Sequence, residues 1–166
     1  MILSYIITGA LMLSALVIQG HSSFDVIRIA GVKPDLIFII VVYLAYSFGS
    51  YYGEVAGFMS GLLHDAVSNS PLGFLAFPKM ALGFLVGMFG RSVIKSNIVT
   101  ISLMLFVSSI IKGILGLFLS YIFLEANAGN IVEIILPESF YNALLAPPLF
   151  FVLDKIFKNE LEGEET

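Results

Sequence analysis

Long apolar stretches alternate with short polar ones along the whole chain. One helix that crosses a bilayer core needs about 20 mostly apolar residues. Six stretches come near this length, and they predict six membrane-spanning helices. If the third stretch is re-entrant or only interfacial, the count falls to five. The predicted spans are about 2–19, 34–49, 53–68, 72–90, 98–124 and 137–157.

Prolines and turn residues separate the apolar stretches. Pro34 and Pro137 fit the first turn of a helix, where the missing N–H costs nothing. The sequence SNSPLG at 68–73 is typical of a tight turn between antiparallel helices. The pattern therefore predicts an all-α integral membrane protein, built as one six-helix transmembrane bundle. We expect residues 158–166 to form a short acidic cytoplasmic tail.

Composition strengthens the membrane prediction. Hydrophobic residues make up 58% of the 166 residues and charged residues 12%, whereas a soluble domain carries about 25% charged residues. The polar stretches are too short to form a separate soluble domain. The first 20 residues lack the positive flank and the cleavage site of a signal peptide, so we expect a retained first membrane helix.

The charged and reactive residues exclude several classes of function. The chain has no cysteine and a net charge of −4, which excludes disulfides and thiolate metal sites and gives no basic run for nucleic acid. There is no catalytic constellation and no phosphate-binding glycine loop. We therefore expect a protein that is not an enzyme, with no metal and no cofactor.

The distribution of Lys and Arg predicts the orientation in the membrane, because cytoplasmic loops carry an excess of these residues. With six spans and a cytoplasmic N-terminus, four positive residues lie on the cytoplasmic side and two, Arg28 and Lys33, lie outside. Both termini are thus predicted to be cytoplasmic. The four cytoplasmic residues are Arg91, Lys95, Lys155 and Lys158.

Glycines recur at every fourth residue in GEVAGFMSGLLHD at 53–65. On a helix, this spacing places Gly53, Gly57 and Gly61 along one face. Small residues let a second helix approach closely in a membrane. Gly113 and Gly116 repeat the pattern on the fifth span. These five glycines are predicted to form a helix-packing surface or a partner interface.

Five Asp, Glu, His or Lys residues lie within the third, fourth and fifth predicted spans, and we expect them to form an intramembrane polar site. A charge at the bilayer centre costs about 2.5–3.5 kcal/mol, so it is paired or faces a cavity. Antiparallel neighbours would bring Lys79 beside Asp65, as a binding site or, in the favoured interpretation, as an ion pair that fixes helix registry. For Lys112 the expected partners are Glu54, Asp65 or a backbone carbonyl. His64 lies at the edge of this face without metal-site spacing.

Four sequence elements together resemble the bacterial rod-shape-determining protein MreD family. In chain order they are PDLIFIIVVYLA at 34–45, GEVAGFMSGLLHD at 53–65, SPLGFLAF at 70–77 and ESFYNALLAPPLFFVLDKIF at 138–157. Lys79 and Lys112 are positions for which no family equivalent is claimed. Outside the glycine stripe, the motif positions are Pro34, Asp35, Pro71, Gly73, Tyr141, Asn142 and Pro147.

The resemblance implies a non-enzymatic scaffold of the cell-elongation machinery in the bacterial cytoplasmic (inner) membrane. Implied partners are the membrane helix of MreC, the MreB filament, a RodA-type glycosyltransferase and a penicillin-binding transpeptidase, besides the lipid bilayer. A homo-oligomer within the complex is left open. The implied fold looks like the six-helix substrate-binding subunit of energy-coupling-factor vitamin transporters.

That likeness supplies a second hypothesis, a small-molecule (vitamin) binding subunit of an energy-coupling-factor-type transporter. Such a pocket should be capped by loops with convergent polar and aromatic groups. The predicted outer loops offer Asp25, Arg28, Asn127 and Asn130 and little else. The sequence therefore favours the scaffold hypothesis.

Overall fold

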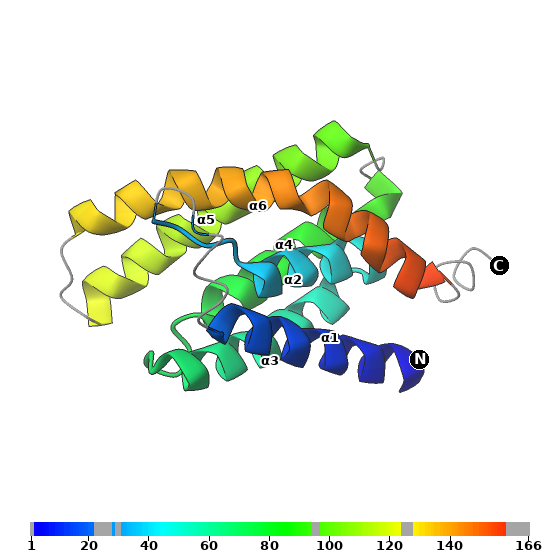
Figure 1. The fold of residues 1–166 in the computed structure, drawn as a ribbon, viewed down its shortest axis with the longest axis horizontal. Coiled ribbons are helices and arrows are strands. Elements are labelled where there is room, and N and C mark those ends of the chain that lie inside the picture. The colour runs from blue at the N-terminus through cyan, green and yellow to red at the C-terminus, as the bar shows by residue number, and fades with distance from the viewer. Residues whose placement is uncertain (1, 22–27, 29–30, 94–96, 124–127, 159–166) are drawn as a thin grey trace.

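A computed structural model describes residues 2–21, 28, 31–93, 97–123 and 128–158 (Figure 1). Within these residues the chain forms six helices and no strand, which confirms the predicted all-α, six-helix architecture. The helices are α1 (Ile2–Gly20), α2 (Leu36–Phe48), α3 (Ser50–Ser68), α4 (Ala76–Val93), α5 (Ile98–Phe123) and α6 (Ala128–Ile156).

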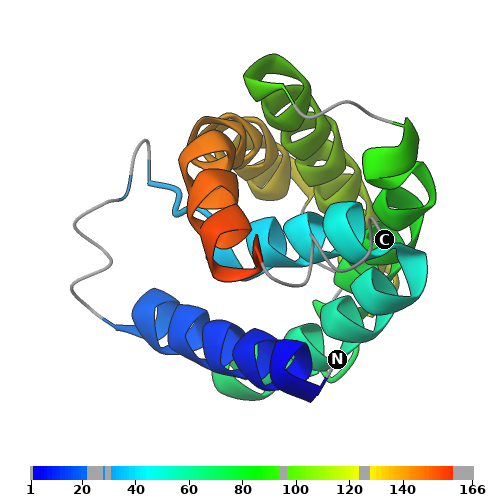
Figure 2. The same cartoon turned by 90° about the vertical axis from the view of Figure 1, so that its right-hand side faces the viewer.

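Helix α2 is the centre of the protein. Every residue from Ile37 to Ser47 is buried, and α2 contacts α1, α3, α4 and α6 (Figure 2). Its sequence, LIFIIVVYLAYSF, is apolar on all sides, as expected of a helix that is enclosed by others. With 13 residues, α2 is about 20 Å long, so it is shorter than a bilayer core.

Glycines bring α3 and α4 into close contact. A Cβ atom added to Gly57 would overlap the backbone of Lys79, and one added to Gly61 would overlap the backbone of Ala76. Larger residues would therefore force the two helices apart. Both glycines face α4 inside the protein, where a partner helix cannot reach them.

The same seam continues toward the other end of α3. A Cβ atom on Gly53 would meet the carbonyl of Gly83 in α4, and one on Gly87 would meet the backbone of Ser50. Gly83 and Gly87 thus extend the glycine pattern onto the facing helix. These two residues were not among the predicted packing glycines, although their four-residue spacing is visible in the sequence.

A single glycine separates α2 from α3. Gly49 has a φ of 89°, in the left-handed region that glycine adopts without strain. Its N–H donates to the carbonyl of Ala45 and so ends α2. This sharp reversal places α3 beside α2 with no intervening loop.

The long helices α5 and α6 pack along each other (Figure 1). Pro137 was expected at the start of the last helix, and this prediction is wrong, because α6 begins at Ala128 and contains Pro137. Contact with α5 supports α6 on both sides of the proline, and neighbouring helices are known to make prolines tolerable in this way. Gly113 faces the side chain of Ile135, whereas a Cβ on Gly116 would meet nothing within 4 Å.

Two segments are long and apolar enough to cross a membrane, by length and composition: Ile98–Phe123 and Glu133–Ile156. Only 22% and 28% of their most apolar windows are buried inside the protein. Large apolar side chains such as Val99 and Phe118 point outward. An exposed apolar surface of this extent suits contact with lipid.

Candidate functional site

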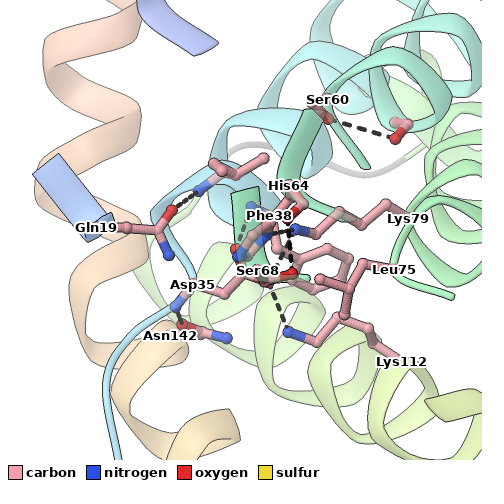
Figure 3. Close-up of polar contacts among 12 residues, drawn as sticks. Gln19, Asp35, Phe38, Ser60, His64, Ser68, Leu75, Lys79, Lys112 and Asn142 are labelled. Carbon is pink, nitrogen blue, oxygen red and sulfur yellow. Dashed lines mark hydrogen bonds and ion pairs between the residues drawn. The ribbon is translucent and has the colours of Figure 1, made fainter. Parts of the chain in front are cut away.

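Asp35 is the centre of a buried polar site (Figure 3). It is the N-cap residue of α2, and its Oδ1 accepts the N–H of Phe38 at 3.0 Å. Its Oδ2 lies 3.3 Å from Nζ of Lys79 and 2.8 Å from Nζ of Lys112. One carboxylate therefore caps a helix and pairs with two lysines from two other helices.

Each lysine has a further partner. Nζ of Lys112 also forms an ion pair with Glu138 of α6, and Nζ of Lys79 lies 2.7 Å from Nδ1 of His64 on α3. Two carboxylates thus balance two ammonium groups across α2, α4, α5 and α6. We call these five side chains, Asp35, His64, Lys79, Lys112 and Glu138, the ion cluster.

Asn142 supports the ion cluster from α6 and is fully buried. Its Oδ1 accepts the N–H of Asp35 at 2.9 Å, and its Nδ2 donates to Oγ of Ser109 at 3.1 Å. Two of the resemblance elements, the Pro-Asp pair before α2 and the Tyr-Asn pair of α6, therefore meet in space. Pro34 precedes the N-cap residue, so the prediction that it lies in the first turn of the helix is wrong. On the α1 side, Gln19 donates to the carbonyl of Pro34 at 3.3 Å.

Asp65 does not pair with Lys79, so that prediction is wrong. The Asp65 carboxylate accepts three backbone N–H groups, from Gly73 at 2.9 Å, Leu75 at 2.8 Å and Ala76 at 3.3 Å. An acidic group is favourable at the start of a helix, where N–H groups lack partners. Asp65 therefore anchors the start of α4, and its carboxylate faces backbone N–H groups instead of a lysine.

The turn before α4 explains a second difference from the sequence prediction. The fourth span was expected to begin at residue 72, whereas α4 begins at Ala76. Residues 71–75 form the turn that Asp65 holds, with Gly73 at a φ of 98°. Pro71 is exposed in this turn.

The expected partners of Lys112 were also wrong. Lys112 contacts Asp35 and Glu138 rather than Glu54, Asp65 or a carbonyl. Glu54 lies ten residues before His64 on α3, about 15 Å along the helix axis. The sequence prediction missed Glu138, because the last helix was expected to begin at residue 137. Since α6 begins at Ala128, Glu138 lies about as far from the start of α6 as Lys112 lies from the end of α5.

The remaining motif positions lie on α6. Tyr141 is half-buried and Pro147 lies inside the helix. Pro147 borders the opposite end of the protein from the ion cluster, beside Asp154.

A cavity of about 640 Å³ adjoins the ion cluster. It is lined by the end of α1, residues 31–35, the turn before α4, and the helices α5 and α6. Gly116 and Ser120 form part of the α5 wall. No group of three or more metal-type ligands occurs in the part of the chain that the structure describes.

A second charged group lies at the other end of the helices. Arg91, in the last turn of α4, forms an ion pair with Asp154 of α6. Asp154 Oδ1 also accepts the hydroxyl of Tyr43 at 3.0 Å, and the Arg91 guanidinium lies 5.5 Å from the ring centre of Tyr46. Lys95, predicted to lie in the adjacent loop, is outside the described residues.

An all-helical bundle with an apolar outer surface and charges collected inside is the architecture of a membrane protein. The sequence profile of the family described as rod shape-determining protein MreD matches residues 1–159. The chain therefore belongs to the MreD family, and this membership supports a role in the determination of rod shape.

No curated protein and no solved structure matches the chain. The likeness to the substrate-binding subunits of energy-coupling-factor transporters stays a prediction.

Proposed function

We propose that this protein is a non-enzymatic membrane scaffold of the bacterial cell-elongation machinery. In this role it binds MreC and helps to couple MreB filaments to peptidoglycan synthesis by a RodA-type glycosyltransferase and a penicillin-binding transpeptidase. The observation that carries the proposal is the family match over residues 1–159. The location that goes with it is the bacterial inner membrane.

The proposed topology is multi-pass with both termini in the cytoplasm. The ion pair between Arg91 and Asp154 supports it, because it brings the end of α4 and the end of α6 to the same side. Lys155, in the last turn of α6, adds a further positive charge there. This end is suited to the MreB filament or to anionic lipid.

The proposed docking site for the MreC membrane helix is a groove of about 460 Å³ between α1 and α3. We call it the α1/α3 groove. Ala56 and Ser60 form a buried floor of small residues, and Gly9 opens the α1 side. Exposed Leu13 and Met59 provide apolar walls. Small residues favour close packing of a second helix inside a membrane.

A second apolar groove, of about 410 Å³, lies between α4 and α5. Large side chains such as Leu85, Phe89 and Leu103 line it, and it contains no glycine. Bulky walls keep an incoming backbone at a distance, so this groove is better suited to lipid chains. The α1/α3 groove is therefore the preferred site for a partner helix.

A matched pair of glycine substitutions tests the docking site. Gly9→Leu places a large side chain in the α1/α3 groove, where a Cβ meets nothing within 4 Å. We expect co-purification of MreC from native membranes to fall at least about tenfold, because roughly 1.4 kcal/mol of lost packing suffices for that change.

Gly116→Leu is the control, because its Cβ site is equally open but faces the cavity beside the ion cluster. It should retain MreC. Full recovery of MreC with a folded Gly9→Leu variant would exclude the α1/α3 groove as the docking site. Loss of MreC in both variants would point to a general defect.

The transporter-subunit hypothesis remains a second candidate because one observation favours it. The cavity of about 640 Å³ falls within the roughly 300–1,000 Å³ typical of small-molecule sites. The same purification distinguishes the two hypotheses. Recovery of transporter ATPases in place of MreC would favour the transporter subunit.

A further inference from the structure

His64 joins α3 to the ion cluster through a short contact. Its Nδ1 lies 2.7 Å from Nζ of Lys79 (Figure 3). Lys79 forms an ion pair with Asp35, so it is an ammonium group and can only donate. The Nδ1 atom of His64 is therefore the acceptor, and the neutral ring carries its proton on Nε2.

The charges around His64 are balanced, so a further positive charge is unfavourable there. The charged groups beside it are Asp35 before α2, Asp65 on α3, Lys79 on α4, Lys112 on α5 and Glu138 on α6, with Arg28 and Lys33 at the cavity wall. The two carboxylates of the ion cluster pair with its two lysines, and Arg28 and Lys33 have interactions of their own. A proton on Nδ1 would face the Lys79 ammonium, where like charges repel.

The two partners of this contact differ in their freedom to move. Lys79 is only 1% exposed and is held by Asp35. His64 is half-buried and lines the cavity of about 640 Å³. When the contact with Lys79 is lost, the ring can turn into this space, where water can solvate its charge.

From this geometry we propose that His64 is a proton-binding residue, and that its protonation releases Lys79 and turns the imidazolium ring into the cavity. Lys79 then keeps its ion pair with Asp35, which it shares with Lys112. Acid therefore weakens a tie between α3 and α4. Only the side from which the proton comes rests on the proposed topology, in which the cavity lies at the outer end of the bundle. The inference does not depend on MreC binding.

The first test is NMR of the purified full chain in an uncharged detergent, with ¹⁵N-labelled histidine. The chain has two histidines, and the His21→Asn variant assigns the signals of His64. At about pH 8 these signals should show a bare Nδ1 and a protonated Nε2. At about pH 5 both ring nitrogens should carry a proton.

The second test is thermal unfolding as a function of pH. His64→Asn keeps an acceptor at every pH, because the amide oxygen can occupy nearly the position of Nδ1. Between about pH 7.5 and 5.5, the Tm of the unsubstituted protein should fall by about 2–4 °C more than that of His64→Asn, because histidine ordinarily gains its proton near pH 6.5. His21→Asn is the matched control, because His21 is exposed after the end of α1. It should keep the full response to pH.

Three results would overturn the proposal. These are a protonated Nδ1 with a bare Nε2 at about pH 8, unchanged His64 signals down to about pH 5, or an equal loss of Tm in His64→Asn. If His64→Asn does not fold, the NMR signals of the unsubstituted protein decide alone. Because MreC is absent from both assays, failure here leaves the docking proposal intact, and failure of the docking test leaves this one intact.

Discussion

The two ends of the protein hold charges in different ways. The ion cluster joins four side chains with formal charge, and its Lys79 side chain is 1% exposed. At the other end, Arg91 and Asp154 form one pair whose side chains are 33% and 39% exposed. Both groups tie helices together, but the side chains of the first are more deeply buried, at 1–19% exposed for its four charged members.

This difference in burial decides how much each group contributes to the stability of the folded protein. Breaking a buried ion pair leaves an uncompensated charge and costs about 3–5 kcal/mol, whereas an exposed pair contributes about 0–1 kcal/mol. Asp35 serves two lysines and a helix cap at once. The ion cluster should therefore make a large contribution to the free energy of unfolding. The pair of Arg91 with Asp154 should make only a small one.

The largest effect is expected for Asp35→Ala. The substitution removes the shared partner of Lys79 and Lys112 and the cap on α2. We expect the free energy of unfolding, measured by reversible denaturation in bicelles, to fall by about 3–5 kcal/mol. A loss below about 1 kcal/mol would contradict the shared-carboxylate arrangement.

Two further variants separate the charge of Asp35 from its cap. Asp35→Asn keeps an acceptor for the N–H of Phe38 and should retain only the cap contribution of about 1 kcal/mol. Adding Lys79→Met to Asp35→Asn should restore part of the stability, because one uncompensated charge is then removed. Additive losses in the double variant would argue against direct coupling of the two residues.

An intermediate effect is expected for Asp65→Asn. An amide replaces one carboxylate oxygen by an NH2 group, so in either orientation at least one of the N–H groups of Gly73, Leu75 and Ala76 loses its acceptor. The expected loss is about 2–3 kcal/mol in the same denaturation assay. Lys79→Met should add to this loss independently, because Asp65 and Lys79 do not form a pair. Strong energetic coupling between the two substitutions would instead indicate that Asp65 and Lys79 form an ion pair.

The smallest effect is expected for Arg91→Ala. The half-exposed pair with Asp154 contributes about 1 kcal/mol or less, and Tyr43 keeps its bond to Asp154. The corresponding thermal unfolding experiment should show a Tm within about 4 °C of the unsubstituted protein. A loss of stability as large as that of Asp35→Ala would show that the two charged groups do not differ in their contribution to stability.

The helices and the glycine seam were largely predictable from the sequence. Gly57 and Gly61 fall on one face by helical spacing alone, and in the structure that face contacts α4. What spacing could not decide was whether the face meets a partner or another part of the chain, because small residues serve both purposes.

The pairing of charges was harder to predict. Equal distance from the turn before α4 identifies His64 with Lys79, but it equally suggests Asp65 for Lys79. It does not identify Glu138 with Lys112, because the last helix was expected to begin at residue 137 and not at Ala128. Backbone N–H groups compete for the Asp65 carboxylate, and that competition is invisible in a residue pattern. Asp35 was recognised only as a motif position, since the two lysines that pair with it lie on α4 and α5, far from it in the sequence.

The most direct test of the central claim, that MreC docks in the α1/α3 groove, is site-specific photo-crosslinking in native membranes. A photoreactive residue replaces Leu13 in this groove or, in a separate strain, Leu103 in the groove between α4 and α5. Both positions are exposed. We predict crosslinks to the membrane helix of MreC from position 13 and none from position 103. Crosslinks from position 103 alone would contradict the account.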